Sequence, residues 1–477
     1  MKNFFSKKNN KWLLLTFFAV AAICCAMVIF LYLPSPKGGW NDRELGICEG
    51  ISGELSGRRF KIISRDGVTL WETPRTFLVQ DVLVTDLDRD GETEIILLLW
   101  KIGKFGKHRP FWVERDELAF SQHVFIYSVS REGKLRHRWG ASEVGDEITR
   151  MKLMEKNNSL LLTEAAGGKC AVWRWDSFGL KTIDSSVSFV VFGDNIIHRE
   201  IYEYADKSEG GSFDFLYEPF YDDIRNADIA AFQQETMLVD KKAAVAGYPL
   251  FGAPIRVGEA IAEAGFDIAS CAGNHALDRG IYGIDVTTSF YREKGITCLG
   301  VQESGDLAYR PYETVSKNGI TFAMFDYTYG TGEMDVRDRY PFAVHYLPRN
   351  EAEEKELIKD LESARNEADF VIVFVHWGNE YETKLSDAQL HMADVFARGG
   401  ADVVLGTHPH VVQDVETVKR PDGGNMLIYY SLGNFRAHQG QSPETKSGGI
   451  ARFEVGHTYD GAKLLDYNLD IIDSYMP

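Results

Sequence analysis

The chain has 477 residues, with 52 Lys and Arg against 70 Asp and Glu, so its formal net charge is −18. A chain of this length forms two or three domains with cores of their own. The acidic balance argues against nucleic acid or an anionic surface as a default partner, because no excess of basic side chains is available to neutralise phosphates. A polyanionic partner would need a local cationic site, which bound divalent metal can supply.

An uncharged apolar segment occupies residues 12–33, after an N-terminus that carries four lysines. At about 1.5 Å per helical residue, this segment is long enough to span the hydrocarbon core of a bilayer. The lysines predict that residues 1–11 are cytoplasmic and that the bulk of the chain is extracytoplasmic. The alternative is a cleaved signal peptide, but the run is longer than a typical signal region and no small-x-small site follows it. We therefore predict a single-pass transmembrane anchor and a location in the cell membrane.

Residues 34–44 are expected to form a linker, and residues 45–183 have the pattern of a β-rich domain. Runs such as FLVQDVLVTDL, TEIILLLW and HVFIYSV are rich in β-branched and aromatic residues, and turn residues separate them. Trp-rich segments around Trp139 and Trp173 hint at repeated hairpins or blades, without a clear period. The four cysteines beyond residue 33 are scattered, so we expect no disulfide framework.

One loop of this β-rich region, DLDRDGETE, places alternate carboxylates around a glycine turn. The candidate ligands are Asp86, Asp88, Asp90 and Glu94, whose oxygens suit Ca²⁺. A complete EF-hand would carry Glu at its twelfth position, where Leu97 stands. The loop instead resembles the calcium loops of FG-GAP or VCBS repeats, a resemblance confined to this motif. The alternative is an acidic hairpin turn that holds no ion.

From residue 186 to residue 477 apolar strands alternate with helix-like stretches, which predicts one α/β domain. Helical spacing and glycine stops predict helices at 257–265, 276–295, 350–368 and 385–400. The short Val/Ile/Phe runs between them predict buried strands, as in a sheet covered by helices.

Five of these apolar runs stop on residues that can bind a metal. SFVVFGD ends on Asp194, DIAAFQQE on Glu235, DIASCAGNH on Asn274 and His275, DFVIVFVH on His376, and DVVLGTHPH on His408 and His410. Ligands of α/β folds bind at the carboxyl ends of strands, so these side chains are expected to converge. Any one of the histidines alone is better explained as a hydrogen-bonded core or loop residue, and only their joint placement favours a site. The mixed ligand set suits Zn²⁺, Mn²⁺ or iron better than Ca²⁺.

Motifs in this region resemble those of the CapA family of poly-γ-glutamate capsule biosynthesis proteins, which are similar to calcineurin-like metallophosphatases. The motifs are GDNIIHR (193–199), AGFDIASCAGNHALDRGIYGI (264–284), VHWGNEY (375–381), GTHPHVVQDVE (406–416) and YYSLGNF (429–435). The resemblance runs from residue 186 to about residue 456 and leaves out the β-rich region. It implies a metallophosphatase-like four-layer α/β sandwich over 186–477.

The resemblance also implies roles for individual residues. Asp194 and His410 would hold a first metal ion, Asn274, His376 and His408 a second, and Glu235 would lie near or between them. His275 would stabilise developing charge or protonate the leaving group, with Asp278 as its orienting partner. One or two ions of Mn, Zn or Fe would activate water for attack on a phosphoryl or carbonyl centre.

Other residues of these motifs concern the substrate. Arg199 matches an arginine of the family and would contact an anionic substrate, although a surface ion pair explains it equally well. Asn434 would line the pocket, and Glu380 would help to shape the cleft wall. Two departures stand out: Ile196 occupies the place of a histidine in the broader phosphatases, and Gln233-Gln234 replace the usual Asn-Leu.

The leading hypothesis is a membrane-anchored extracytoplasmic protein of capsule or poly-γ-glutamate biosynthesis, export or processing, with a metal-dependent hydrolase site. Its partners would be an anionic polymer such as poly-γ-glutamate and subunits of a capsule synthase. The alternative is a non-catalytic scaffold or polymer guide within a membrane-bound synthase complex, which the two departures favour. A third interpretation gives the function to the β-rich region, as a calcium-dependent binder of wall or polymer.

Overall fold

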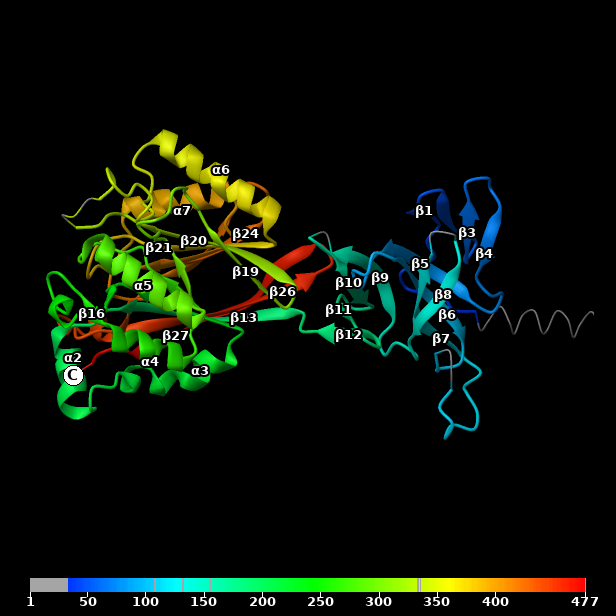
Figure 1. Ribbon diagram of the computed structural model, residues 1–477, viewed down its shortest axis with the longest axis horizontal. Coiled ribbons are helices and arrows are strands. Elements are labelled where there is room, and N and C mark those ends of the chain that lie inside the picture. Colours follow the sequence, from blue (N-terminus) through cyan, green and yellow to red (C-terminus); the bar gives the residue numbers. More distant parts are fainter. Residues whose placement is uncertain are drawn as a thin grey trace, which may run out of the picture. The chain divides into compact units, whose positions relative to one another are not determined.

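A computed structural model describes residues 33–476 apart from residues 107–108, 131–132, 155, 333 and 335. The chain divides into two compact units, Met1–Ile183 and Asp184–Pro477 (Figure 1). Within the described residues no helix is long and apolar enough to cross a bilayer, so the predicted location in the cell membrane is wrong by this finding. The segment 12–33 on which that prediction rested lies, except for Leu33, outside the described residues.

The first unit consists of three antiparallel sheets, each made from four successive strands. The first sheet contains β1 (Arg43–Cys48), β2 (Ile51–Ser56), β3 (Arg59–Ser64) and β4 (Thr69–Glu72). The second contains β5 (Leu78–Thr85), β6 (Thr93–Ile102), β7 (Phe120–Val129) and β8 (Leu135–Gly140). The third contains β9 (Ile148–Met154), β10 (Asn157–Ala165), β11 (Cys170–Asp176) and β12 (Gly179–Ile183).

The middle sheet of this unit is buried on both faces, which explains the continuous apolar run of β6. Successive side chains of a strand point to opposite faces. Ile95 and Leu97 accordingly pack in one core with residues of the first sheet, and Ile96 and Leu98 pack in another with residues of the third.

The second unit contains two large sheets. One has the order β18-β17-β14-β13-β26-β27, with β25 beside β13, and the other has the order β19-β20-β21-β22-β24-β23. The strands of the first are β13 (Ser186–Asn195), β14 (Ile229–Gln234), β17 (Ile268–Ser270), β18 (Thr297–Leu299), β25 (Asn434–Arg436), β26 (Ser447–Thr458) and β27 (Gly461–Asp473). Those of the second are β19 (Glu313–Lys317), β20 (Ile320–Thr328), β21 (Phe370–His376), β22 (Val403–Thr407), β23 (Val415–Lys419) and β24 (Asn425–Tyr429). Outside these sheets, β15 (Leu238–Val239) pairs with β16 (Ala253–Pro254).

Helices cover the outer face of each sheet. On the first sheet lie α2 (Arg199–Ser208), α3 (Tyr221–Asn226), α4 (Ile255–Ala264) and α5 (Gly280–Lys294), and on the second lie α6 (Glu351–Glu367) and α7 (Asp387–Gly399) (Figure 1). Short 3-10 turns are η1 (Asp214–Leu216), η2 (Glu218–Phe220), η3 (Lys242–Ala244) and η4 (Glu444–Lys446). The helices expected from sequence spacing are present as α4 to α7.

A shared apolar core lies between the two sheets and makes the unit a four-layer α/β/β/α sandwich. Phe189 and Val191 of β13 point into this core, together with Ile372 of β21. Val190, one position along β13, packs instead against the helices of the first sheet, and Val373 packs against those of the second. Both sheets are therefore apolar on both faces, which is typical of parallel strands covered by helices.

Candidate metal centre

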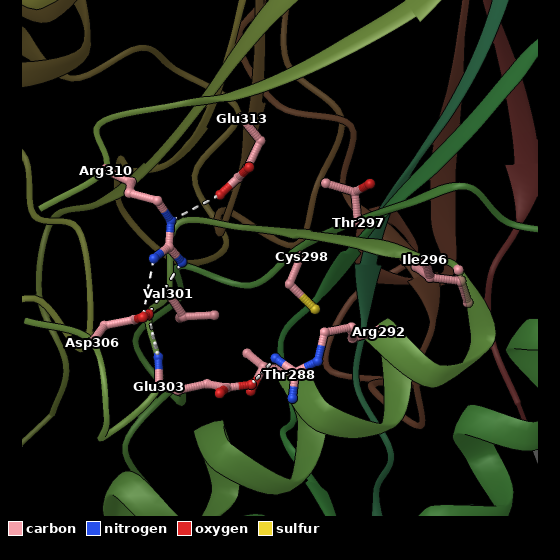
Figure 2. A pocket seen from close by; sticks show the side chains of 11 residues that line it. Thr288, Arg292, Ile296, Thr297, Cys298, Val301, Glu303, Asp306, Arg310 and Glu313 are labelled. Atoms are coloured by element: carbon pink, nitrogen blue, oxygen red, sulfur yellow. Dashed lines mark hydrogen bonds and ion pairs between the residues drawn. The ribbon is translucent and has the colours of Figure 1, made fainter. Parts of the chain in front are cut away.

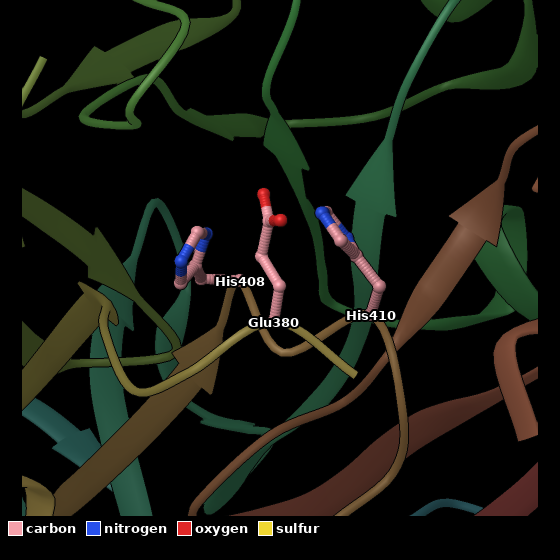
Figure 3. A group of neighbouring side chains, drawn as sticks. All are labelled: Glu380, His408 and His410. Carbon is pink, nitrogen blue, oxygen red and sulfur yellow. The ribbon is translucent and has the colours of Figure 1, made fainter. Parts of the chain in front are cut away.

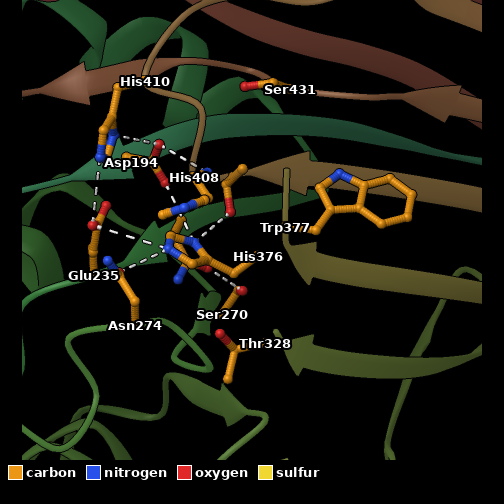
Figure 4. A network of polar contacts seen from close by, with 12 residues as sticks. Asp194, Glu235, Ser270, Asn274, Thr328, His376, Trp377, His408, His410 and Ser431 are labelled. Atoms are coloured by element: carbon orange, nitrogen blue, oxygen red, sulfur yellow. Dashed lines mark hydrogen bonds and ion pairs between the residues drawn. The ribbon is translucent and has the colours of Figure 1, made fainter. Parts of the chain in front are cut away.

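The candidate ligands meet at the edge of the sandwich where parallel strands of both sheets end (Figure 4). Asp194 lies at the end of β13 and Glu235 directly follows β14, so both come from the first sheet. His376 ends β21 of the second sheet, and the loop after β22 carries His408 and His410. Asp194 and His410 are 216 positions apart in the chain, yet they are in contact.

Contacts of 3.0 to 4.0 Å link carboxylates and a side-chain amide to the imidazoles. His410 Nδ1 lies 3.1 Å from Asp194 Oδ2, and His410 Nε2 lies 3.9 Å from Glu235 Oε1. His376 Nε2 lies 3.0 Å from Asn274 Oδ1 and 4.0 Å from Glu235 Oε1. Glu235 is therefore placed between two histidines that come from different strands, in the arrangement expected for a carboxylate near two metal positions.

The loop with both histidines has an unusual backbone on either side of Pro409. His408 has a φ of 97° and His410 a φ of 59°, which L side chains rarely adopt. Such conformations cost on the order of 1–3 kcal/mol each and persist where the surroundings hold them, commonly at functional sites. Here the backbone N–H of His408 donates to Asp194 Oδ2 at 3.2 Å, so the loop is held against β13.

The position of Asp194 depends on the glycine before it. A Cβ at Gly193 would lie 1.9 Å from the carbonyl oxygen of Gly433, so only glycine lets this chain segment approach so closely. Asn434 then pairs with Asp194 across the two strands. Its side chain is fully buried and donates to Gln439 Oε1 at 3.0 Å. Asn434 is not among the residues that line the cavity described below, and its Oδ1 has no hydrogen-bond partner among the described residues.

Several polar atoms of this cluster are buried without a hydrogen-bond partner among the described residues. They are both carboxylate oxygens of Glu235, Oδ1 of Asp194 and Nδ1 of His408. Buried polar atoms in proteins are nearly always paired, so a concentration of unpaired ones needs an explanation. Carboxylate oxygens and imidazole nitrogens are ligands of divalent transition metals, and the residues present therefore fit such an ion.

Burial keeps two of the imidazoles in the neutral state that a metal requires, whereas it favours the protonated form of Glu235 when no metal is bound. Burial lowers the pKa of His376 well below its ordinary value, and the neighbouring His408 and His410 lower it further. Burial lowers the pKa of His408 to about 3, and the nearby His410 contributes to the decrease. Both rings are therefore neutral near pH 7 and keep a nitrogen lone pair. Burial raises the pKa of Glu235 well above its ordinary value, and Asp194 raises it further.

His275 and Asp278 form a separate pair beside the cluster. His275 Nδ1 lies 2.7 Å from Asp278 Oδ2, and the backbone N–H of Phe251 donates to the same oxygen at 2.7 Å. The ring of Phe251 packs edge-on against that of His275, with 4.8 Å between the centroids. Since Asp278 engages Nδ1, the other ring nitrogen, Nε2, is left for a substrate.

A cavity of about 570 Å³ opens beside the cluster. Glu235 and His410 form part of its wall, and His275 and Glu380 form another part. Arg199 at the start of α2 also lines it and makes no ion pair with any described residue. The surface ion pair considered from the sequence is thus absent from the described part of the chain.

Sequence reasoning gave Glu380 only a place in the cleft wall, but its carboxylate faces the two loop histidines (Figure 3). One ligand atom each of Glu380, His408 and His410 lies within 4.8 Å of the others. Tyr329 was missed altogether; its ring lies 4.7 Å from that of His408. The position of Glu380, four residues after His376 in the same strand-end motif, is the signal that would have singled it out.

The two departures noted in the sequence have local explanations. Ile196 packs with Phe251 and Ala437, so it is part of an apolar cluster. Gln233 donates to the carbonyl oxygen of Ala272 at 3.2 Å, and Gln234 donates to that of Thr236 at 2.5 Å. The side-chain amides of both glutamines thus donate to backbone carbonyl oxygens. Because Ile196 is apolar, Asp194 is the one predicted ligand in the segment 194–196.

Another cavity, of about 450 Å³, shares no lining residue with the first (Figure 2). Its arginines are already neutralised: Arg310 pairs with Asp306 at 3.0 Å and with Glu313 at 3.4 Å, and Arg292 pairs with Glu303. This cavity has no unpaired charge of its own that would select a ligand.

The acidic loop of the first unit has a cationic side chain within it. One oxygen each of Asp86, Asp88 and Glu94 lies within 4.8 Å of the others, as calcium ligands would. The guanidinium of Arg138, however, pairs with Asp88 and also lies 3.4 Å from Asp90 and 3.8 Å from Glu94. Burial raises the pKa of Glu94 to about 7. One internal cation therefore offsets part of the negative charge of the four carboxylates that the sequence assigned to Ca²⁺.

Together these observations define a class of protein: an α/β/β/α sandwich with a carboxylate–imidazole cluster at the strand ends, beside an open cavity. The family model described as bacterial capsule synthesis protein PGA_cap matches residues 188–439, and the chain belongs to this family. The resemblance to CapA proteins predicted from the sequence is therefore confirmed.

Individual relatives are similar over part of their length. The capsule biosynthesis protein CapA of Bacillus anthracis is 26% identical over 294 residues, which cover 59% of this chain and 67% of that protein. The PGA biosynthesis protein CapA of Bacillus subtilis strain 168 is 30% identical over 199 residues, which cover 40% of this chain and 50% of that protein. This chain thus spans 67% and 50% of the lengths of these two relatives.

Two solved structures show a distant likeness, each with 15% identity and a TM-score of 0.36. A novel phosphatase from Mycoplasma pneumoniae matches over 62% of this chain and 96% of its own. The calcineurin-like phosphoesterase YfkN from Bacillus subtilis matches over 60% of this chain and 91% of its own.

Proposed function

We propose that this capsule synthesis family member is a metal-dependent hydrolase that processes an anionic polymer such as poly-γ-glutamate. The observation that carries the proposal is the set of buried, unpaired ligand atoms on Asp194, Glu235 and His408, which lies against a cavity. The names of the CapA relatives support the polymer class. Divalent Mn, Zn or Fe, as one or two ions, suits the ligands.

One group of residues at the cavity would bind the metal. Asp194, Asn274, His376, His408 and His410 would hold the metal, with Glu235 near or between the positions. When bound, the metal supplies an activated water for attack on a phosphoryl or carbonyl centre.

Substrate binding and proton transfer fall to residues on the cavity side. Arg199 would bind an anionic group of the substrate, since its guanidinium faces the cavity without a carboxylate partner. His275, oriented by Asp278, would donate a proton to the leaving group or stabilise its charge through Nε2.

Metal analysis and hydrolysis assays on the same protein test this proposal. The full chain, loaded with Mn²⁺ or Zn²⁺, is assayed with bis(p-nitrophenyl) phosphate and with poly-γ-glutamate. His410→Ala and His408→Ala should each lose bound metal and turnover. His391→Ala is the matched control, because His391 lies on the surface of α7 and pairs with Glu354 at 2.8 Å. Unchanged metal content in the first two variants would remove the basis of the proposal.

A second candidate is a non-catalytic scaffold or polymer guide in a synthase complex. Ile196 favours it, because this residue stands in the place of a histidine of the broader phosphatases and packs with Phe251 and Ala437. The same experiment separates the two functions. Metal binding with no turnover on either substrate would favour the scaffold, and turnover that depends on His410 would exclude it.

A further inference from the structure

Glu380 lies on the open side of the metal centre, although it comes from a turn that is otherwise exposed. Its carboxylate stands between the rings of His408 and His410 in Figure 3. One ligand atom of each of these three residues lies within 4.8 Å of the others. Ligands about 2.0–2.2 Å from one ion are at most roughly 4.4 Å apart, so shifts of a few tenths of an ångström would bring all three to one ion.

The turn that carries Glu380 is fixed to the histidine loop. The backbone N–H of Tyr381 donates to the carbonyl oxygen of Pro409 at 2.8 Å. That carbonyl belongs to the residue between the two histidines. This backbone hydrogen bond therefore keeps Glu380 next to the histidine loop, independently of what the Glu380 side chain binds.

The rest of the shell leaves this side open. Asp194, Glu235 and His376 are buried and approach the centre from within the sandwich. Nδ1 of His408 is buried and has no hydrogen-bond partner among the described residues. Ile196 lines the cavity with an apolar side chain and offers no ligand.

Charge is consistent with an added carboxylate. Asp194 and Glu235 supply two carboxylates, and Glu380 brings the number of carboxylates to three. One divalent ion would leave a net charge of −1, and two would leave +1. Carboxylates favour Mn²⁺ among the metals that also accept imidazole.

We propose that Glu380 is a metal ligand of this centre, which it approaches from the cavity side together with His408 and His410. This inference rests on the proposed function, because it presumes that the cluster binds a divalent cation. Mn²⁺ is the cation that the ligand set favours.

The test is calorimetric titration of the full chain with Mn²⁺. Glu380→Gln preserves the size of the side chain and removes its charge, and we expect Mn²⁺ affinity to fall at least about tenfold. Glu382→Gln is the matched control, since Glu382 is exposed in the same turn and its carboxylate accepts a hydrogen bond from Asn379 at 3.0 Å. Its affinity should equal that of the wild type. The visible absorption bands of Co²⁺-loaded protein give a second readout, which should change in Glu380→Gln and not in the control.

The outcomes separate this inference from the proposed function. Wild-type affinity and an unchanged Co²⁺ spectrum in Glu380→Gln, with metal binding lost in His410→Ala, would refute the role of Glu380 and leave the metal centre standing. A wild-type chain that binds no Mn²⁺, Zn²⁺ or Co²⁺ would overturn the proposed function and this inference with it. Thermal melting in EDTA checks that Glu380→Gln is folded.

Discussion

Replacing Glu235 by Gln should make the protein more stable without metal and less stable with it. Glu235 is 1% exposed, and neither carboxylate oxygen has a hydrogen-bond partner among the described residues. Its pKa is raised by burial and by Asp194, so the charged form is unfavourable in the folded state. The amide of Gln carries no charge, although it still leaves polar atoms buried.

The magnitude follows from these two effects. Removing an unpaired buried charge should stabilise the metal-free protein by about 1–3 kcal/mol, after the cost of burying the amide. Metal at a hundred times its Kd should stabilise the wild type by about 2.7 kcal/mol. Glu235→Gln should lose most of this gain, so the order of stability should reverse between EDTA and metal.

Calorimetric melting of the full chain at pH 8, in EDTA and in excess Mn²⁺, measures both effects. Glu259→Gln, an exposed carboxylate on α4, should change stability by less than about 0.5 kcal/mol in either buffer. A Glu235→Gln variant that melts below the wild type in EDTA would refute the reasoning. It would mean that the Glu235 carboxylate is favourably paired in the metal-free protein.

Three further predictions concern other parts of the chain. Burial lowers the pKa of His345 to about 3, so folded-state stability is lost as pH falls below about 6.5 and the unfolded chain takes up a proton. Between pH 6 and pH 4, the free energy of unfolding of His345→Phe should fall less steeply with decreasing pH than that of the wild type, by about 1.4 kcal/mol per pH unit. Equal pH dependences of the two proteins in urea unfolding would contradict this. Phe435 is fully buried, and its ring centroid lies 4.3 Å from that of Phe192. Phe435→Ala should therefore lower the free energy of unfolding in urea by about 3–5 kcal/mol, and a decrease below about 1 kcal/mol would show that neighbouring side chains fill the space. Adding Ca²⁺ should increase the melting temperature of Arg138→Met more than that of the wild type, because the variant lacks the cation beside Asp88. An equal increase in both proteins would show that the guanidinium does not compete with Ca²⁺.

The strand ends were predictable because a buried strand is a local pattern. The apolar runs before His376 and after Ala401 are short, rich in β-branched residues and bounded by polar ligands, and they form β21 and β22. The helices followed from spacing and from their caps; Ser386 and Gln389, for example, form a capping box at the start of α7.

What the sequence could not show depends on contacts between distant segments. Pairing of β13 with β26 joins residues more than 250 positions apart, and no local pattern indicates which strands share a sheet. The position of Glu380 depends on the bond from Tyr381 to Pro409, and the pairing of Arg138 with Asp88 spans 50 positions. In each case the individual residue types were visible and their partners were not.

The ligands come from two sheets that otherwise adhere through an apolar core, with Asp194 and Glu235 on one and His376, His408 and His410 on the other. A cation bound by ligands from both sheets would link the two sheets at one edge of the sandwich. Amide hydrogens of β14 and β22 should then exchange more slowly in concert when metal is added, since neither sheet could open at that edge without releasing the ion.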